Sequence, residues 1–202
     1  MASSAILLSL GILLLAQADT RPSVEEFKAG VSHQKTKTVY RYEAKSPRED
    51  FQGLYRFIRK EYPHVSSEDA KQIAESLVDY GHENQLDPHL VAALISKESG
   101  FNKRAVSKTG AKGLGQIKSF NFDDLKIQNP YNIRQNVRGT SRYLKSLFQR
   151  WRGEDNAATL ALASYYKGPN AVAGMKDNLD QDASRYAKGV LKQYEKIKKN
   201  LR

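Results

Sequence analysis

The 202-residue sequence contains no cysteine. Disulfide bonds are therefore excluded, and so is lipid attachment to a cysteine behind an export signal. The sequence also lacks internal repeats, low-complexity segments and the Gly-rich phosphate-binding motifs G-x-G-x-x-G and G-x-x-x-x-G-K-[ST]. Its four histidines, at positions 33, 64, 82 and 89, do not have the spacing of metal ligands. We therefore expect neither a metal ion nor a nucleotide cofactor.

The one long apolar segment lies at the N-terminus. Residues 1–18 carry no charge, and the small-x-small sequence A-Q-A at 16–18 is followed by Asp19. This pattern predicts a secretory signal peptide over residues 1–18 and release of a soluble protein into the periplasm or the extracellular space. The segment before the apolar run has no Lys or Arg, which leaves an uncleaved membrane anchor as the alternative. The run is short for a span of about 20 residues, so cleavage is favoured.

The exported part is strongly basic. The formal net charge is +11, and residues 1–18 contribute none of it. A basic exported protein suggests an anionic partner surface, such as acidic wall material or phospholipid headgroups. Nucleic acid is the usual alternative, but the signal peptide argues against it and no helix carries a clear set of base-reading side chains. We therefore expect no nucleic-acid partner.

Residues 19–66 form an N-terminal extension with few clear signals. Residues 38–42, T-V-Y-R-Y, suggest a short strand. Phe51, Leu54 and Ile58 have helical spacing, and Pro63 would end that helix. We expect this extension to pack on the main domain or to tether it.

Residues 67–202 show helical spacing of apolar side chains almost throughout, which predicts one mainly α-helical domain. The expected helices are one capped by Ser67 and ending near Gly81, one following Asp87, one opening at Asn129-Pro130, one over residues 155–166, a short one opening at Pro169 and a basic one over residues 185–202.

The helix after Asp87 ends at a glutamate with unusual surroundings. Asp87 is a good N-cap, Pro88 suits the first helical position, and Gly100 suits a helix stop. Glu98 lies on the apolar face of this helix, at helical spacing from Val91, Leu94 and Ile95.

Two effects should raise the pKa of Glu98. The negative end of the helix dipole lies at the C-terminus, and burial on an apolar face removes solvation from the carboxylate. A carboxylic acid that stays protonated near neutral pH is what general acid catalysis at a glycosidic oxygen requires. The alternative for the helix alone is a solvated glutamate at a frayed end, and the flanking sequence decides against it.

Five segments in a fixed order carry that flanking pattern. They are E-S-G-F-N at 98–102, A-V-S-K-T-G-A-K-G-L-G-Q-I at 105–117, N-P-Y-N-I at 129–133, A-S-Y-Y-K-G-P-N-A-V at 163–172, and Tyr186 with Val190-Leu191. Together they resemble the lytic transglycosylases, the soluble-transglycosylase branch of the lysozyme-like superfamily, over roughly residues 67–191. The resemblance implies a mainly α, lysozyme-like (goose-type lysozyme/transglycosylase) single domain over residues 67–202, with a small β or irregular portion beside the cleft. Some exported members are lipoproteins, and the absence of cysteine excludes that anchoring here.

The resemblance also implies site residues. Glu98 looks like the family's catalytic acid/base. Ser107 and Gln116 correspond to positions that line the sugar cleft, and Tyr186 corresponds to a late tyrosine directed toward the catalytic glutamate. Tyr165 matches the tyrosine of the family motif A-Y-N-A-G-P. The alternatives are structural: a turn residue for Ser107, a core aromatic for Tyr165 and an apolar helix anchor for Tyr186.

The sequence departs from the family pattern at two places. Gly115 replaces the methionine of the usual G-L-M-Q, which would remove an apolar wall of the sugar site. Ser164, Tyr166 and Lys167 replace the Ala, Asn and Ala of A-Y-N-A. Tyr166 could stack on a sugar face, and Lys167 could meet a carboxylate of a peptide stem.

The implied reaction uses one acid. The nearest downstream carboxylates, Asp123 and Asp124, are better explained as helix-cap or surface acids. With Glu98 alone, the family chemistry cleaves the MurNAc-GlcNAc β-1,4 bond of peptidoglycan glycan strands and forms 1,6-anhydromuramic acid, assisted by the substrate acetamido group. Two alternatives remain open: a muramidase-type hydrolase on the same fold, and a non-catalytic cell-wall-binding protein.

Overall fold

The computed structural model describes residues 46–200, which fall within one compact unit of the chain. The signal peptide and the strand predicted at 38–42 lie outside the described residues. The elements are α2 (Pro47–Glu61), α3 (Ser67–Glu83), α4 (Pro88–Ser99), the 3-10 helix η1 (Ser119–Asn121), α5 (Phe122–Leu125), α6 (Ile133–Arg150), α7 (Ala157–Lys167), α8 (Pro169–Ala173) and α9 (Gln181–Lys199). Within residues 46–200 there is no β-strand, only isolated β-bridges in the segment after α4. The predicted mainly α fold class is confirmed.

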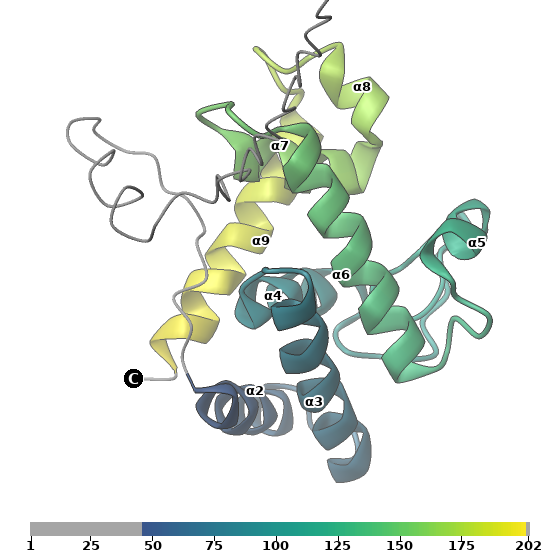
Figure 1. Ribbon diagram of the computed structural model, residues 1–202, viewed down its shortest axis with the longest axis vertical. Helices are drawn as coiled ribbons and strands as arrows, with labels where there is room; N and C mark the ends of the chain where they lie inside the picture. The colour runs from purple at the N-terminus through teal and green to yellow at the C-terminus, as the bar shows by residue number, and fades with distance from the viewer. Residues whose placement is uncertain (1–45, 201–202) are drawn as a thin grey trace, which may run out of the picture. The chain divides into compact units, whose positions relative to one another are not determined.

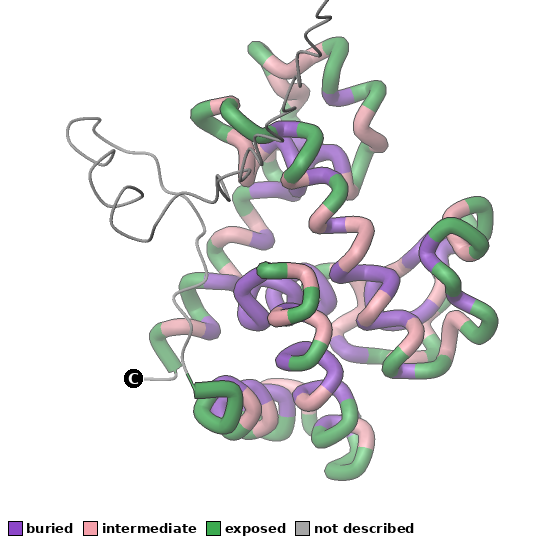
Figure 2. Tube along the Cα trace, in the orientation of Figure 1, coloured by how far each residue is buried: buried purple, intermediate pink, exposed green. Residues whose placement is uncertain are grey.

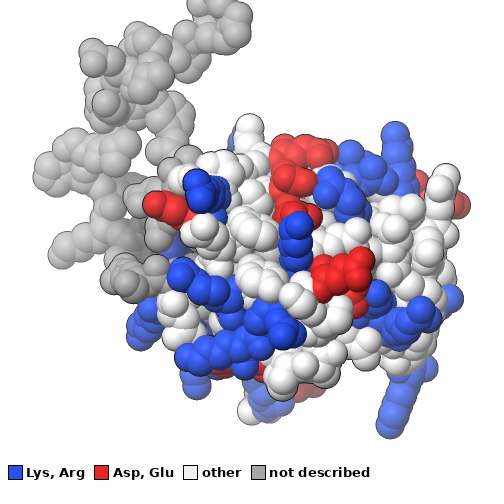
Figure 3. Space-filling model, turned by 90° about the horizontal axis from the view of Figure 1, so that it is seen from below, with Lys and Arg blue, Asp and Glu red and all other residues white. Residues whose placement is uncertain are grey.

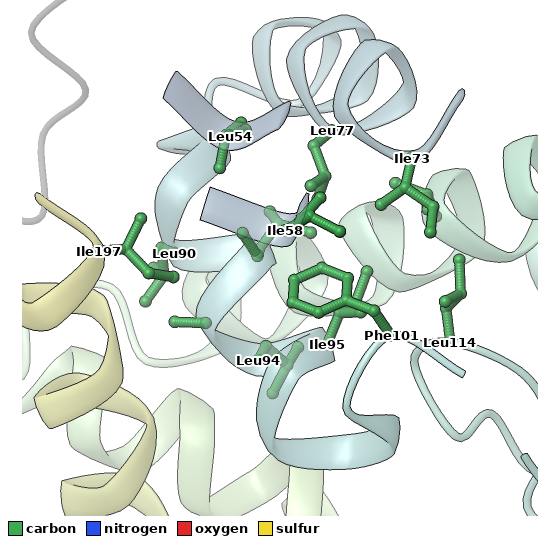
Figure 4. Close-up of a cluster of buried hydrophobic side chains, with 14 of the residues drawn as sticks. Leu54, Ile58, Ile73, Leu77, Leu90, Leu94, Ile95, Phe101, Leu114 and Ile197 are labelled. Carbon is green, nitrogen blue, oxygen red and sulfur yellow. The ribbon is translucent and has the colours of Figure 1, made fainter. Parts of the chain in front are cut away.

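Helix α4 lies at the centre of this arrangement (Figures 1 and 2). Residues 88–95 are all buried, as expected of a helix that is apolar on every side. It packs against α3, α9 and α2. Figure 4 shows side chains from these helices and from the segment after α4 converging on one core. A residue at the end of α4 is therefore held by a rigid, central element.

The ends of α4 agree with their sequence signals. The Asp87 carboxylate caps the N-terminus by accepting a hydrogen bond from the His89 backbone N–H at 2.9 Å. Gly100 ends the helix in the left-handed conformation, with φ of 56°. Both features place Glu98 in the last turn, as predicted.

Four predicted helix starts were wrong by one to four residues. Helix α7 begins at Ala157 rather than at residue 155, and α9 begins at Gln181 rather than at Arg185, because Asp180 is its cap. Helix α6 begins at Ile133 rather than at Asn129-Pro130, because Asn132 is the cap and accepts from the Gln135 N–H at 3.0 Å. Asn129 instead stabilises a turn by accepting from the Tyr131 N–H at 3.0 Å. Helix α3 is capped by Ser66, one residue before the serine that the sequence suggested.

Helix α2 lies inside the predicted N-terminal extension and contributes to the core. Leu54, Phe57 and Ile58 are buried in the same cluster as the side chains of α4. The C-cap of α2 is Tyr62, directly before Pro63, where the sequence predicted the helix to end. This part of the extension is packed on the main domain.

A buried polar cluster joins the N-terminus of α4 to α9 and α2. The Asp87 carboxylate accepts from the Tyr194 hydroxyl at 2.6 Å, and its other oxygen lies 2.7 Å from His89 Nδ1. Nε2 of His89 lies 3.7 Å from Asp50 on α2. Burial alone would raise the pKa of Asp87, but the hydrogen bonds from His89 and Tyr194 outweigh it and lower that pKa to about 2. The cluster therefore holds an ionised carboxylate at the positive end of the helix dipole.

Candidate active site

Glu98 lies in the last turn of α4, where the chain reverses. Gly100 and Phe101 both have positive φ, 56° and 61°, so the chain turns sharply just after the glutamate. Phe101 is buried, and its ring packs edge-on against Tyr62 at 4.8 Å between centroids. Tyr62 in turn shares a hydrogen bond of 2.6 Å with the Ser96 hydroxyl on α4. These contacts fix the end of the helix and hence the backbone position of Glu98.

The carboxyl group of Glu98 is partly buried and has one tyrosine partner. Burial raises its pKa, while a hydrogen bond from the Tyr186 hydroxyl and the positive charge of Lys97 act in the opposite direction. The net direction is upward, so the protonated form is favoured compared with a free glutamate. The sequence predicted this direction from burial and the helix dipole.

Tyr186 reaches Glu98 from α9 and is itself covered by a second tyrosine. Its side chain is buried, and its ring stacks on Tyr166 with centroids 4.8 Å apart and an interplanar angle of 13°. Tyr166 is 51% exposed, so this aromatic pair can be reached from solvent. Lys167 lies over the Tyr166 ring at 5.9 Å and pairs with Asp180, the N-cap of α9, at 2.8 Å.

Tyr165 is close enough to Glu98 for the negative charge of the glutamate to affect its ionisation. Burial and the negative charge of Glu98 both raise the pKa of Tyr165 well above its ordinary value. Its hydroxyl donates to the Gly115 carbonyl at 2.7 Å, and its ring packs on Tyr143 at 5.2 Å. Tyr165 thus remains a neutral phenol that ties α7 to the Gly-rich segment.

The Gly-rich segment after α4 is the small irregular portion that the sequence suggested. Its backbone makes two isolated antiparallel bridges, Val106 with Lys112 and Lys112 with Ile117. Gln116, with φ of 50°, uses its side-chain amide to donate to the carbonyls of Ala105 and Gly113 at 3.2 and 2.9 Å. The segment is therefore held in shape partly by a side chain that the resemblance placed on the sugar.

Ser107 also has a structural role in this segment. Its hydroxyl accepts from the Ala111 N–H at 3.0 Å and lies 3.2 Å from the Thr109 hydroxyl. No hydrogen bond in the described part of the chain joins Ser107 or Gln116 to Glu98. The structure brings together Glu98, Tyr186, Tyr166 and Tyr165, and it places Ser107 and Gln116 in the adjoining loop.

Gly115 is enclosed by α6. A Cβ at this position would overlap Thr140 Oγ1 and lie 3.0 Å from Thr140 Cβ and Cγ2. Its N–H donates to the Asn136 side chain at 2.8 Å, so the backbone cannot move away without losing that bond. Thr140 fills the space that a side chain at 115 would need. In this chain the glycine and the threonine form a matched pair.

Among the described residues, neither Asp123 nor Asp124 contacts the Glu98 carboxyl group. Asp123 is exposed and lines a separate groove of about 480 Å³ beside α5 and α6, together with Lys126 and Arg138. Asp124 is exposed on the same short helix. Within residues 46–200 no group of three or more His, Asp or Glu side chains has a geometry that fits a metal ion.

Two contributors to the site were not identified from the sequence. Lys97 lowers the pKa of Glu98 by its charge, and its place directly before the glutamate could have suggested this. Tyr143 packs on Tyr165 from α6, and its helical spacing with the apolar side chains of that helix did not indicate this contact.

Comparison with known proteins identifies sequences similar to this chain. The model of the transglycosylase SLT domain family matches residues 76–187. The transglycosylase of Enterobacteria phage PRD1 is 38% identical over 85 residues, which is 42% of this chain and 31% of that protein. The membrane-bound lytic murein transglycosylase F of Alteromonas mediterranea is 31% identical over 118 residues, 54% of this chain and 26% of that protein. The chain thus spans less than a third of the length of these relatives.

Two solved structures share the fold. An inactive mutant of lytic transglycosylase Slt from Pseudomonas aeruginosa superposes with a TM-score of 0.58 at 19% identity, over 73% of this chain and 30% of that one. The 70 kDa soluble lytic transglycosylase of Escherichia coli gives a TM-score of 0.53 at 18% identity, over 78% of this chain and 31% of that one.

Proposed function

Since this chain belongs to the transglycosylase SLT domain family, we propose that it is a peptidoglycan lytic transglycosylase. It would cleave the β-1,4 bond between N-acetylmuramic acid and N-acetylglucosamine and leave a 1,6-anhydromuramic end. The observation that carries this proposal is the carboxyl group of Glu98, which sits at the end of a buried helix with a raised pKa and a single phenolic partner.

Glu98 acts first as an acid. It donates its proton to the glycosidic oxygen as the bond to the muramic C1 breaks, and the glucosamine leaves as an alcohol. The acetamido group of the muramic residue supports the positive charge that develops at C1. The Tyr186 hydroxyl then stabilises the carboxylate that Glu98 has become.

Glu98 acts next as a base. It takes the proton of the muramic 6-hydroxyl, whose oxygen bonds to C1 and closes the anhydro ring. The glutamate ends protonated, no water is consumed, and the site is ready for another turnover. One carboxyl group is sufficient for both steps.

The tyrosines give the site its remaining chemistry. Burial and the nearby Glu98 charge raise the pKa values of both Tyr165 and Tyr186, so both hydroxyls stay protonated and act only as hydrogen-bond donors or acceptors. The exposed face of Tyr166 provides an aromatic platform for a sugar ring. Ser107 and Gln116 support the Gly-rich loop after α4, which would form the other wall of the sugar-binding cleft.

Two further proposals concern where the protein works. We infer export to the periplasm or the extracellular space through the signal peptide at residues 1–18. Among the described residues no helix is long and apolar enough to cross a bilayer. The substrate would be the glycan strands of the cell wall, which fits the basic net charge of +11.

The deciding experiment is mass spectrometry of the muropeptides released from purified peptidoglycan. The wild-type protein is compared with Glu98→Gln and with a matched control, Glu68→Gln, which changes an exposed glutamate on α3. We expect 1,6-anhydromuramic ends from the wild type and the control and none from Glu98→Gln. Reducing ends would identify a hydrolase instead. Absence of products, with the protein still sedimenting with peptidoglycan, would identify a wall-binding protein.

A further inference from the structure

The solvent face of α9 carries a stripe of basic side chains. The stripe consists of residues three or four apart, namely Arg185, Lys188, Lys192, Lys196 and Lys199. All of them are exposed, and they lie opposite the buried positions of the helix. At 1.5 Å per residue the stripe runs for about 21 Å. Helix α9 is the yellow helix in Figure 1.

Much of this charge is not neutralised by the protein. Arg185 pairs with Asp182, and Lys196 pairs with Glu61 on α2. In the part of the chain that the structure describes, Lys188, Lys192 and Lys199 take part in no ion pair. Figure 3 shows one face of the molecule, on which Lys and Arg form a large group at the lower left and smaller groups at the right. Three of the five charges of the stripe are therefore left without a paired acid among the described residues.

The stripe continues to the edge of the candidate active site. Lys97, on α4, lies alongside α9, because a Cβ added at Gly189 would be 3.7 Å from its Nζ. The same ammonium group acts on the Glu98 carboxyl group. Positive charge thus extends from beside Glu98 along most of α9. A ligand bound along α9 would therefore lie beside a glycan strand whose cleaved bond is at Glu98.

The chemistry of the stripe restricts the ligand. A membrane-surface helix presents an apolar face to the lipid, but the apolar face of α9 is buried in the core. The stripe contains no aromatic or aliphatic side chain that would recognise a base or a hydrophobic group. Recognition must therefore rest on charge, through groups such as carboxylates that pair with ammonium groups.

We propose that the α9 stripe binds the carboxylates of the peptide stems carried by the same glycan strand that Glu98 cleaves. This inference rests on the proposed function, since peptidoglycan is the strand in question. It assigns the basic charge a specific role: the stripe makes substrates with peptide stems bind more tightly than bare glycan. Because the interaction is electrostatic and exposed, it weakens as ionic strength rises.

The test compares two soluble probes, uncrosslinked glycan strands with their peptide stems and the same strands stripped of peptides by an amidase. Binding to the full chain carrying Glu98→Gln is measured by fluorescence anisotropy, so that no turnover is needed. Adding Lys188→Gln and Lys192→Gln should weaken binding of the peptide-bearing strands about 3- to 10-fold, from the usual strength of exposed ion pairs. Binding of the stripped strands should change less, because the amidase leaves them only the lactyl carboxylate of each muramic residue.

Two control proteins make the result specific to this surface. Lys71→Gln with Arg152→Gln removes the same charge from exposed positions on α3 and after α6, and it should leave both affinities unchanged. Lys188→Arg with Lys192→Arg keeps the charge and should retain the preference for peptide-bearing strands.

Binding to anionic phospholipid vesicles is measured for the same proteins by sedimentation, and three outcomes would overturn the proposal. These are equal losses on both probes, no loss on the peptide-bearing probe, and a loss confined to binding of anionic phospholipid vesicles. Peptide-dependent binding by a protein whose wild type releases no anhydromuropeptides would uphold the stripe and overturn the proposed function. The two ideas can therefore fail separately.

Discussion

The Tyr186 hydroxyl on α9 donates a hydrogen bond to the Glu98 carboxyl group at the C-terminal end of α4. The same two helices make a second bond of this kind at their other end, where the Tyr194 hydroxyl donates to Asp87 at 2.6 Å. The pKa values of the two carboxyl groups nevertheless shift in opposite directions: burial dominates at Glu98 and raises its pKa, whereas at Asp87 the hydrogen bonds from His89 and Tyr194 outweigh burial and lower the pKa. One pair of helices thus holds one carboxyl group that stays ionised and one that is protonated more readily than a free side chain.

Removing the Tyr186 hydroxyl should change the pH profile in a defined direction. That hydroxyl lowers the pKa of Glu98, so Tyr186→Phe should raise the pKa further. Because the general acid works in its protonated form, the basic limb of kcat should move to higher pH. The carboxylate formed during the reaction also loses a donor, so kcat at the optimum should fall roughly 10- to 100-fold. Release of anhydromuropeptides across a pH series measures both effects.

Lys97 provides an independent check on the direction in which the pKa of Glu98 shifts. Lys97→Gln removes a positive charge that also lowers the pKa of Glu98, so its basic limb should move the same way. Lys71→Gln, on an exposed face of α3, should leave the limb in place. A shift of the Tyr186→Phe limb toward lower pH would contradict the assignment of Glu98 as the acid.

Local signals made α4 and Glu98 predictable. Asp87, Pro88 and Gly100 act on their own backbone neighbours, so their meaning does not depend on the rest of the fold. The start of α6 was missed because Asn129 and Asn132 are both suitable caps, and in the structure Asn132 caps the helix while Asn129 stabilises the turn before it.

Contacts between segments far apart in the sequence were harder to predict from the sequence. The stack of Tyr166 on Tyr186 joins α7 to α9, and no sequence pattern specifies that their rings lie parallel. The bonds of the Gln116 amide to its own loop could not be foreseen either, because they depend on a positive φ that an L-residue seldom adopts.

Asp87 should stabilise the fold through its charge. Its pKa is about 2 in the folded protein and 3.8 in the free side chain, a difference equivalent to about 2 kcal/mol of stability. The sign follows from the lowered pKa: the stabilisation is complete above about pH 4 and is lost as the pH falls toward about 2. Asp87→Asn keeps a good helix cap and removes the charge. Urea unfolding should show a deficit of about 2 kcal/mol at pH 7 that disappears by about pH 2.

Asp79→Asn is the matched control for this measurement. Asp79 is exposed and pairs with Arg134 at 3.0 Å, so its loss should change the free energy of unfolding by less than about 1 kcal/mol. A deficit for Asp87→Asn that stays constant from pH 7 to pH 2 would mean that shape rather than charge is responsible.

Gly115 and Thr140 should behave as a coupled pair. Gly115→Ala forces a Cβ against Thr140 and should lower the free energy of unfolding by about 1–3 kcal/mol. Thr140→Ala removes the two atoms beyond Cβ, so the double variant should lose less than the sum of the single losses. Denaturant unfolding of the four proteins gives the coupling energy. Strictly additive losses would show that the steric contact does not limit the choice of residue at position 115.

Tyr166 should affect substrate binding more than the chemical step. Tyr166→Asn, which restores the residue usual in the family, removes the exposed aromatic face but leaves the bond from Tyr186 to Glu98. Loss of one aromatic contact should raise KM for glycan strands about 2- to 12-fold, with kcat changing less. Tyr166→Phe keeps the ring and should retain the wild-type KM. If kcat fell while KM stayed constant, Tyr166 would instead act by positioning Tyr186, and the basic limb of the pH profile would then move as it does for Tyr186→Phe.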